Sequence, residues 1–222
     1  MRLPFSPIYL LLFVLALGLL LVVVQIGAIT IAFDKLGLSG GGVFLLLFGS
    51  LVGSLINLPL FSMVSESPPD MSAATPLHRL LQIPAMPFNG RTIVAINVGG
   101  GLIPIFFSIY LLAHNPLPLW QALFGIAAVA GLSRALSRPI PGIGIGMPIF
   151  VAPIGAAILA LLINPAASAP LAYIAGTLGV LVGADLLRLA DVRHMGTPFA
   201  SIGGAGTFDG IFITGIVAVL LA

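Results

Sequence analysis

Charged residues are scarce in this sequence. Its 222 residues include eight Lys or Arg and six Asp or Glu, 6% of the chain, whereas a soluble domain carries about 25%. Hydrophobic residues make up 59%, and the mean hydropathy is +1.24. So few polar side chains cannot cover the surface of a water-soluble globule, which excludes a soluble enzyme, a nucleic-acid-binding protein and a disordered chain. The composition predicts an integral membrane protein whose first partner is the lipid bilayer.

Cysteine is absent, which excludes a disulfide framework, a thiolate nucleophile and a Cys-ligated metal. The three histidines, His78, His114 and His194, are far apart and match no zinc-protease motif. We therefore expect neither a metal nor a cofactor. Glycine (27) and proline (18) are abundant, which predicts closely packed, kinked or broken helices.

Seven apolar runs are candidate membrane spans, each of which needs about 17–25 helical residues. They lie at about 8–32, 43–64, 92–113, 117–132, 147–163, 171–187 and 202–222. The fourth run is short, which predicts a tilted or incomplete crossing. Because no room remains for a soluble domain, we expect residues 1–222 to form a single transmembrane domain, an all-α polytopic bundle. Trp120 and Tyr173, near span ends, are predicted to be interfacial anchors.

The basic residues support this number of spans, since Lys and Arg gather in cytoplasmic loops. With a cytoplasmic N-terminus, Lys35 is outside and seven arginines are inside: Arg2, Arg79, Arg91, Arg134, Arg138, Arg188 and Arg193. This asymmetry predicts a C-terminus outside, a cytoplasmic loop at 65–91 and a position in the cell (inner) membrane. Asp191, in the last inner loop, is expected to face water.

This topology places four Gly-rich or polar segments in one layer on the cytoplasmic side. They are Asn97 with Gly99–Gly101, the Pro/Gly run Pro139–Pro148, Asp185, and Gly203–Gly210. In the second of these, glycines interleaved with proline favour an extended or re-entrant segment. Gly176, Gly179 and Gly183 are predicted to form a helix-packing face.

Asp209 is the most unusual residue of this layer. It lies about seven residues into an apolar span, with no charged residue nearby in the sequence, and an ionisable group inside a membrane is costly and marks a functional site by default. Alternatively, it caps a broken helix. Asp185 is a second candidate, although Arg188, three residues on, allows an ordinary helical ion pair. Asn97 either joins helices by hydrogen bonds or contacts a ligand.

Two blocks of sequence resemble a known family. Asn97-Val98-Gly99-Gly100-Gly101-Leu102-Ile103-Pro104 and Ser201-Ile202-Gly203-Gly204-Ala205-Gly206-Thr207-Phe208-Asp209-Gly210-Ile211-Phe212 are similar to an uncharacterised family of prokaryotic membrane proteins, domain-of-unknown-function family 1614. The resemblance covers most of the chain and implies a polytopic membrane protein, without a function. The two blocks also echo each other, as parallel repeats in transporters do.

A weaker resemblance is mechanistic. Presenilin-type and signal-peptide-peptidase-type intramembrane proteases carry one catalytic Asp on an inward-running helix and the second in a Gly-x-Gly-Asp motif on the next helix. Asp185 and Asp209 are similar in position, in consecutive spans. The segment Gly206-Thr207-Phe208-Asp209 departs from the motif at Phe208, and the Pro-Ala-Leu motif of a last helix has no counterpart.

Three functions remain open. The first is an intramembrane aspartyl protease acting on a transmembrane peptide, in which two carboxyls share a proton. The second is a proton- or cation-coupled transporter or channel for a small polar solute, using Asp209. The third is a non-catalytic scaffold. The predicted site has Asp185 and Asp209 as catalytic residues and a substrate-binding set of Asn97, Gly144, Gly146, Gly203, Gly204, Gly206 and Thr207. Nothing in the sequence specifies an oligomeric state.

Overall fold

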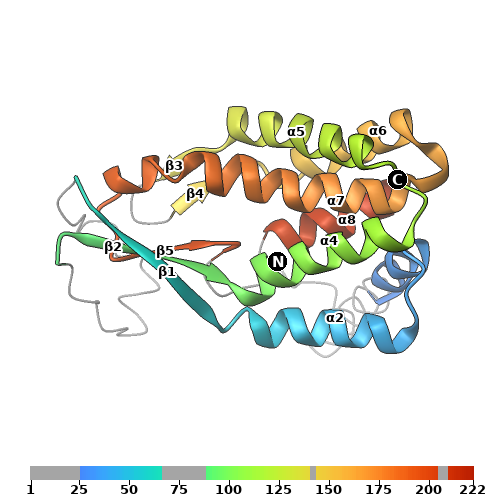
Figure 1. The fold of residues 1–222 in the computed structure, drawn as a ribbon, viewed down its shortest axis with the longest axis horizontal. Coiled ribbons are helices and arrows are strands. Elements are labelled where there is room, and N and C mark those ends of the chain that lie inside the picture. The colour runs from blue at the N-terminus through green and yellow to red at the C-terminus, as the bar shows by residue number, and fades with distance from the viewer. Residues whose placement is uncertain (1–25, 67–88, 141–143, 205–209) are drawn as a thin grey trace, which may run out of the picture.

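The computed structural model describes residues 26–66, 89–140, 144–204 and 210–222, and it is mostly helical (Figure 1). A helix at Ile26–Lys35 comes first. The elements that follow are α2 (Gly40–Gly53), β1 (Asn57–Val64), β2 (Arg91–Asn97), η2 (Val98–Leu102), α4 (Ile103–His114), α5 (Leu119–Leu136), β3 (Arg138–Ile140), β4 (Gly144–Gly146), α6 (Val151–Ile163), η3 (Pro165–Ala167), α7 (Ser168–Val180), η4 (Leu181–Asp185), η5 (Leu186–Arg188), η6 (Asp191–His194), β5 (Phe199–Ile202) and α8 (Gly210–Leu221). Of these, η2 and η4 are π-helical turns, and η3, η5 and η6 are 3-10 turns.

Helix starts follow local sequence signals. Ser39 caps α2, because its side-chain oxygen accepts a hydrogen bond from the Gly42 N–H at 3.3 Å. Pro104 lies in the first turn of α4, and Pro118 directly precedes α5. Proline suits the start of α5 because the first N–H groups of a helix have no partner within it, whereas Pro104 follows the π-helical turn η2 inside the continuous helix Val98–His114.

The central helix of the bundle is α7. It packs against α4, α5, α6 and α8, and nearly all of its residues are buried. Glycines permit this close packing: a Cβ at Gly179 would lie 2.6 Å from the Val129 Cβ, and a Cβ at Gly183 would meet the Ala130 carbonyl oxygen. The predicted packing role of these glycines is confirmed.

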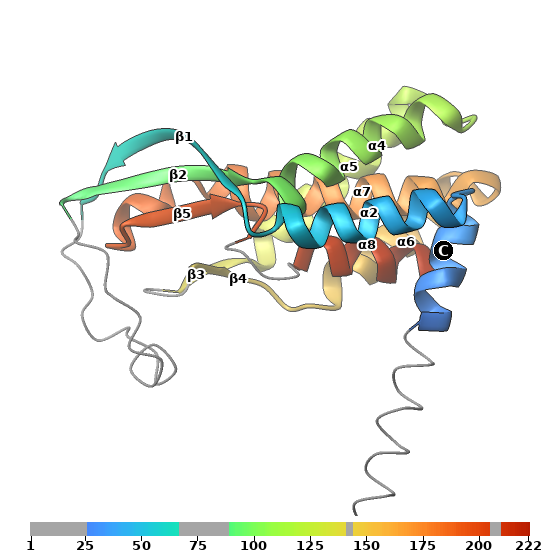
Figure 2. The same ribbon diagram turned by 90° about the horizontal axis from the view of Figure 1, so that it is seen from below.

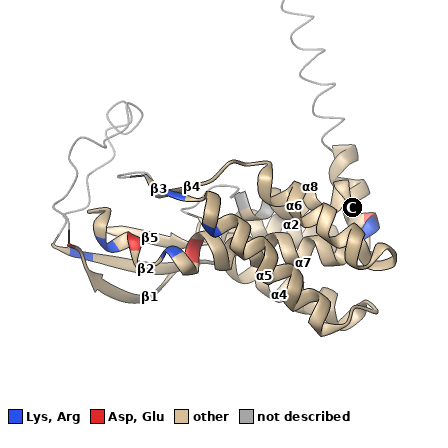
Figure 3. Ribbon diagram, turned by 90° about the horizontal axis from the view of Figure 1, so that it is seen from above, with Lys and Arg blue, Asp and Glu red and all other residues tan. Residues whose placement is uncertain are grey.

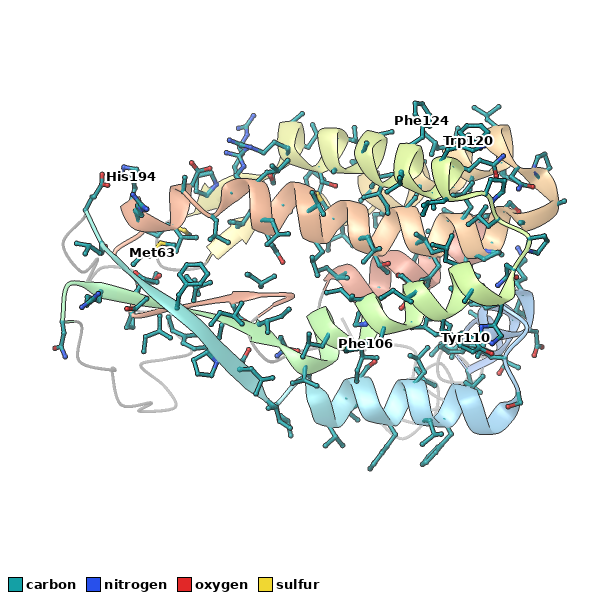
Figure 4. All side chains as sticks on the ribbon, viewed as in Figure 1. Met63, Phe106, Tyr110, Trp120, Phe124 and His194 are labelled. Atoms are coloured by element: carbon teal, nitrogen blue, oxygen red, sulfur yellow. The ribbon has the colours of Figure 1, made fainter. Side chains whose placement is uncertain are left out.

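Tyr173 belongs to this buried layer and is not an interfacial anchor. It is fully buried, and its ring meets Phe107 edge-on with 4.9 Å between the ring centroids. The prediction is wrong because Tyr173 lies one turn inside the helix, on its packed face. Trp120 is exposed at the start of α5, beside Phe124 (Figure 4).

Two of the described helices are long and apolar enough to cross a membrane. They are α5 and the continuous helical stretch Pro165–Arg188. A third is reached if Ile26–Lys35 and α2, which are bent by 115° relative to each other, form one broken span. Shorter apolar helices run over Val98–His114 and Val151–Ile163. The prediction of apolar membrane-type helices is confirmed at this level, whereas seven spans and their orientation stay predictions.

A three-stranded sheet extends from one end of the bundle (Figure 2). Its strand order is β1-β2-β5. Strands β1 and β2 are antiparallel, from Asn57 opposite Asn97 to Val64 opposite Arg91, with an irregularity between Pro59 and Phe61. Strands β2 and β5 are parallel, and β3 and β4 form a separate antiparallel pair. The all-α prediction is therefore wrong for these segments.

Three predicted spans contain strands. The helix in 43–64 ends at Gly53, and Asn57–Val64 forms β1; span 92–113 is helical only after Asn97; and span 202–222 begins at the end of β5, with α8 starting at Gly210. The physical reason is visible in β2, whose β-branched residues favour an extended backbone although they satisfy a hydropathy window. Conversely, α5 extends four residues beyond the predicted span 117–132 and is long enough to cross a membrane. Span 8–32 and loop 65–91 lie largely outside the described residues.

Most charged residues lie in the half of the molecule that carries the sheet, and a smaller group lies near the C-terminus (Figure 3). The described arginines lie at the end that carries the sheet, on β2, β3, the last turn of α5, η5 and η6. Lys35 lies at the opposite end, where its Nζ donates to the carbonyls of Val219 and Leu220 at 3.3 Å. This separation agrees with the arrangement expected from the loop charges.

Candidate functional site

A buried amide lies where the sheet meets the helices. Asn97, the last residue of β2, is 1% exposed. Its side-chain oxygen accepts a hydrogen bond from the Gly100 N–H at 2.7 Å, which caps η2. Its Nδ2 donates to the Ser54 carbonyl at 2.7 Å and to the Asn57 Oδ1 at 3.2 Å. Asn97 therefore joins α2, β1, β2 and η2 through hydrogen bonds, the first of the two roles expected for it.

Asn57 extends this network to the third strand. Its Oδ1 also accepts a hydrogen bond from the Ser201 Oγ at 2.6 Å. Ser201 lies in β5, so one amide oxygen of β1 connects to both other strands of the sheet. We call Asn57, Asn97 and Ser201 the amide cluster. Since Asn97 is buried, a slip of the strand register would leave its amide without these partners, which favours the observed register.

Gly203 lies against η2. It has a φ of +83°, which an L side chain rarely adopts, and a Cβ there would lie 2.5 Å from the Gly101 N. A Cβ at Gly100 would in turn overlap the Gly203 carbonyl oxygen. The two Gly-rich blocks of the sequence are thus in backbone contact, which requires glycine on both sides.

Asp185 contacts the same glycine. It ends η4, is partly buried, and its Oδ2 accepts a hydrogen bond from the Gly203 N–H at 2.7 Å. Two π-helical turns, η2 and η4, therefore converge on Gly203. Such turns are rare and are frequent at functional sites, so this junction is the candidate functional site.

The two Gly-rich blocks also share a local architecture. Strand β2 continues through η2 into α4, and parallel strand β5 continues through Gly203 and Gly204 toward α8. Each unit is a strand, a glycine-rich connection and an apolar helix. The strands of the two blocks pair in parallel, whereas residues 205–209 of the second block lie outside the described residues.

Arg188 forms a second polar cluster next to the site. Its guanidinium donates to the Asp191 Oδ2 at 2.9 Å, the Arg134 carbonyl at 2.9 Å and the Ser137 Oγ at 3.1 Å, and also to the Ser137 carbonyl. A cation on the last carbonyls of a helix is favourable, so Arg188 caps the C-terminus of α5. Asp191 is accordingly paired with Arg188 and Arg134, while its side chain, which was expected to face water, stays partly exposed.

The other predicted site residues fall into two groups. Gly144 and Gly146 are extended, as predicted, and their strand partners are Ile140 and Arg138 in β3. Gly204 follows Gly203 with a φ of +89°. Asp209, Gly206 and Thr207 lie outside the described residues.

Sequence reasoning missed Asn57 and the Ser54 carbonyl as partners of Asn97. Asn57 could have been noticed as a polar residue within an apolar run. The hydropathy of that run predicts a helix, however, and a helix does not indicate that the Asn57 side chain faces Asn97. Among the described residues no group of three or more His, Cys, Asp or Glu could hold a metal. A groove of about 700 Å³ lies between α2 and α4 (lined by Gly37, Leu38, Ser39, Gly42, Leu45, Leu46, Ile103, Phe106, Phe107 and Tyr110), and none of its lining residues belongs to the junction.

These features define a mostly helical protein with helices apolar and long enough for a membrane, and with a strand-and-glycine junction that holds buried amides and a carboxylate. The chain belongs to the family described as Protein of unknown function (DUF1614), whose model matches residues 51–221. The match begins in α2 and includes every residue of the junction described above. No curated protein and no solved structure matches the chain, so the resemblance to presenilin-type proteases stays a hypothesis.

Proposed function

We propose that the chain is a multi-pass protein of the cell (inner) membrane with the activity of an intramembrane aspartyl protease, using Asp185 and Asp209 as its catalytic pair. The observation that supports this most is the hydrogen bond from the Gly203 N–H to the Asp185 carboxylate. Gly203 and Asp209 belong to one Gly-rich segment, six residues apart in the sequence. The bond therefore ties the first aspartate to the segment that contains the second.

The chemistry needs both carboxyl groups and one shared proton. The carboxylate takes a proton from water as the water oxygen bonds to the carbonyl carbon of the scissile peptide, and the carboxylic acid gives its proton to the carbonyl oxygen. Collapse of the resulting diol breaks the C–N bond, and the amine leaves with a proton from the pair. The proposal requires the two carboxyls within about 3–6 Å of each other.

The sheet offers an edge for an extended substrate. In the described part of the chain, β1 and β5 are the outer strands. Strand β1 contains Pro59 and an irregular register there, features that protect an edge from pairing. Strand β5 contains no proline and leads directly to Gly203. A substrate strand is therefore expected to pair along β5, where backbone hydrogen bonds would bring its peptide bond toward Asp185.

The test is proteolysis by the full-length protein in liposomes. The substrates are synthetic apolar helices with a Gly- or Pro-weakened centre, and the products are identified by mass spectrometry. Asp185→Asn and Asp209→Asn are each expected to lower the cleavage rate at least about 10³-fold, since either change removes the acid–base pair. Asp191→Asn, which changes a nearby aspartate that pairs with Arg188, is expected to retain activity.

Equal cleavage by the wild type and both variants would refute the proposal. So would products of unchanged amount after the same samples are treated with a hydroxyl-containing transition-state analogue of aspartyl proteases. Circular dichroism of each variant separates lost chemistry from lost folding.

The transport and scaffold functions stay predictions. Transport requires a polar cavity reaching Asp209, and an Asp209→Asn variant that folds but loses solute or proton flux in liposomes would support it. A scaffold is supported if Asp185→Asn/Asp209→Asn protein keeps its cellular role in a deletion strain.

A further inference from the structure

The ribbon formed by β1 and β2 exposes apolar side chains along most of its length. Five consecutive residues of β1, Leu58–Ser62, are exposed, which means that both faces of the strand are open. The exposed fractions of the large apolar side chains are 43% for Leu58, 53% for Leu60, 47% for Phe61, 64% for Val64 and 45% for Ile93. Met63, by contrast, is buried (Figure 4).

The ribbon is expected to be unstable both in bulk water and in the hydrocarbon core of a bilayer. In water, a contiguous apolar surface on an edge strand promotes aggregation. In hydrocarbon, the outer edge of β1 would leave N–H and C=O groups without partners, and lipid-exposed open edges do not occur there. The boundary between acyl chains and headgroups suits both features, because it solvates the backbone edge and accepts the apolar side chains.

Arginines lie at the far end of the same ribbon. Arg91 is opposite Val64 in the register, and the Arg193 carbonyl accepts hydrogen bonds from the Glu66 N–H at 2.8 Å and the Ser65 Oγ at 3.1 Å. Both arginines are exposed. Within the described residues neither has an ion pair, whereas Arg134 and Arg188 pair with Asp191. The nearby Glu66 carboxylate lies 3.0 Å from the His194 Nε2.

The spacing of these groups matches the layers of a bilayer surface. Phe61 is three residues from Val64, about 10 Å along the strand. The headgroup region on each side of a bilayer is several ångströms thick, so apolar side chains at Leu58–Phe61 can contact acyl chains while Arg91 and Arg193 reach phosphates. The two exposed guanidinium groups add attraction for anionic headgroups.

We propose that the β1–β2 ribbon is a lipid-binding surface that inserts Leu58, Leu60 and Phe61 into the acyl–headgroup boundary and binds anionic phospholipid through Arg91 and Arg193. This surface is separate from Asp185 and from the β5 edge, so the proposal is independent of the protease function. It assigns the free face of β1 to lipid and not to a second copy of the chain.

The test uses tryptophan fluorescence, because the chain has a single tryptophan, Trp120. In a Trp120→Phe background, Phe61→Trp is reconstituted into liposomes containing lipids brominated near the headgroup or deep in the acyl chain. We expect blue-shifted emission and at least about twofold stronger quenching by the shallow bromines. Phe124→Trp, exposed on α5, is the control that deep bromines should quench more strongly. Leu60→Trp repeats the measurement if Phe61→Trp does not fold.

The headgroup preference is tested by comparing brominated phosphatidylglycerol with brominated phosphatidylcholine at equal mole fraction. Brominated phosphatidylglycerol should quench the tryptophan at position 61 at least about fivefold more strongly than brominated phosphatidylcholine. A fivefold preference corresponds to the attraction of one arginine to an anionic surface, about 1 kcal/mol. Arg91→Gln/Arg193→Gln should bring the ratio to about one. Arg138→Gln removes one positive charge from β3, and Arg91→Gln removes one from β2; the first should leave the ratio unchanged and the second should lower it.

Several results would overturn the proposal. Emission typical of water without lipid quenching would place the ribbon in solvent, and strongest quenching by deep bromines would place it in hydrocarbon. Blue-shifted emission that lipid does not quench and that grows with the protein-to-lipid ratio would indicate that a second copy covers the face. An equal loss of preference in Arg138→Gln would show a general charge effect without a site.

Discussion

The Gly203 N–H donates a hydrogen bond to the Asp185 Oδ2 at 2.7 Å, and this bond connects the end of the most buried helix to the glycine-rich end of β5. Gly203 also lies in contact with Gly100 and Gly101 of η2. The junction therefore depends on a backbone group that is presented correctly only if residue 203 keeps its positive φ.

Gly203→Ala is expected to destabilise the protein by at least about 2 kcal/mol, because the new Cβ meets the Gly101 backbone and the left-handed conformation is costly for alanine. A thermal unfolding midpoint about 4–8 °C lower follows for a chain of this size. The measurement is a melting curve in mild detergent, followed by circular dichroism.

Gly131→Ala is the matched control. Gly131 lies in α5, and a Cβ added to it would have no atom within 4 Å, so alanine should leave the melting temperature unchanged or raise it slightly. Equal effects of the two substitutions would contradict the close contact at Gly203.

Asn97→Ala is expected to cost about 2–4 kcal/mol of folding free energy. The change removes the cap of η2 and leaves the Gly100 N–H and the Ser54 carbonyl without their hydrogen bonds in a buried position. Asn115→Ala removes a single hydrogen bond, to the Leu111 carbonyl at the end of α4, and should cost about 1 kcal/mol or less. Denaturant titration in detergent measures both, and a smaller loss for Asn97→Ala would argue against the amide cluster.

Arg188→Met should destabilise the protein more than Arg138→Met. The Arg188 side chain is 14% exposed and caps α5 while pairing with Asp191. Its loss is therefore expected to cost about 1.5–3 kcal/mol, the range for hydrogen bonds to a charged group. Arg138 is exposed on β3 and should change stability by about 0.5 kcal/mol or less. Thermal melts of both variants at low and high salt measure the two losses of stability. A large loss in Arg138→Met would contradict the specific role of Arg188 as the cap of α5.

The proximity of Asn97, Asp185 and Gly203 was predictable from the sequence, and the local structure around them was not. Hydropathy and the arginine distribution placed Asn97, Asp185 and Gly203 in one layer, and the structure joins them through Asn57, Ser201 and the Gly203 amide. The strands were missed because an apolar run such as Thr92-Ile93-Val94-Ala95-Ile96 fits a membrane helix by composition, and only its long-range pairing makes it a strand. The π-helical turns and the Arg188–Asp191 pair depend on the same tertiary contacts.

The strand pairing itself can be tested by disulfide formation, since the chain contains no cysteine that would interfere. Ser62 and Ile93 are directly opposite each other in β1 and β2, and both are exposed. Opposite residues in an antiparallel pair have Cα atoms about 4.5–5.5 Å apart, within disulfide range. Ser62→Cys/Ile93→Cys should therefore crosslink with a mild oxidant, as judged by mass spectrometry after proteolysis.

The control is Ser62→Cys/Thr92→Cys, which should crosslink far less because Thr92 is buried on the other face of the strand. Equal yields of crosslink for the two cysteine pairs, or no crosslink for the first pair, would contradict the pairing of β1 with β2. Such a result would support the helical spans that the hydropathy of these segments predicts.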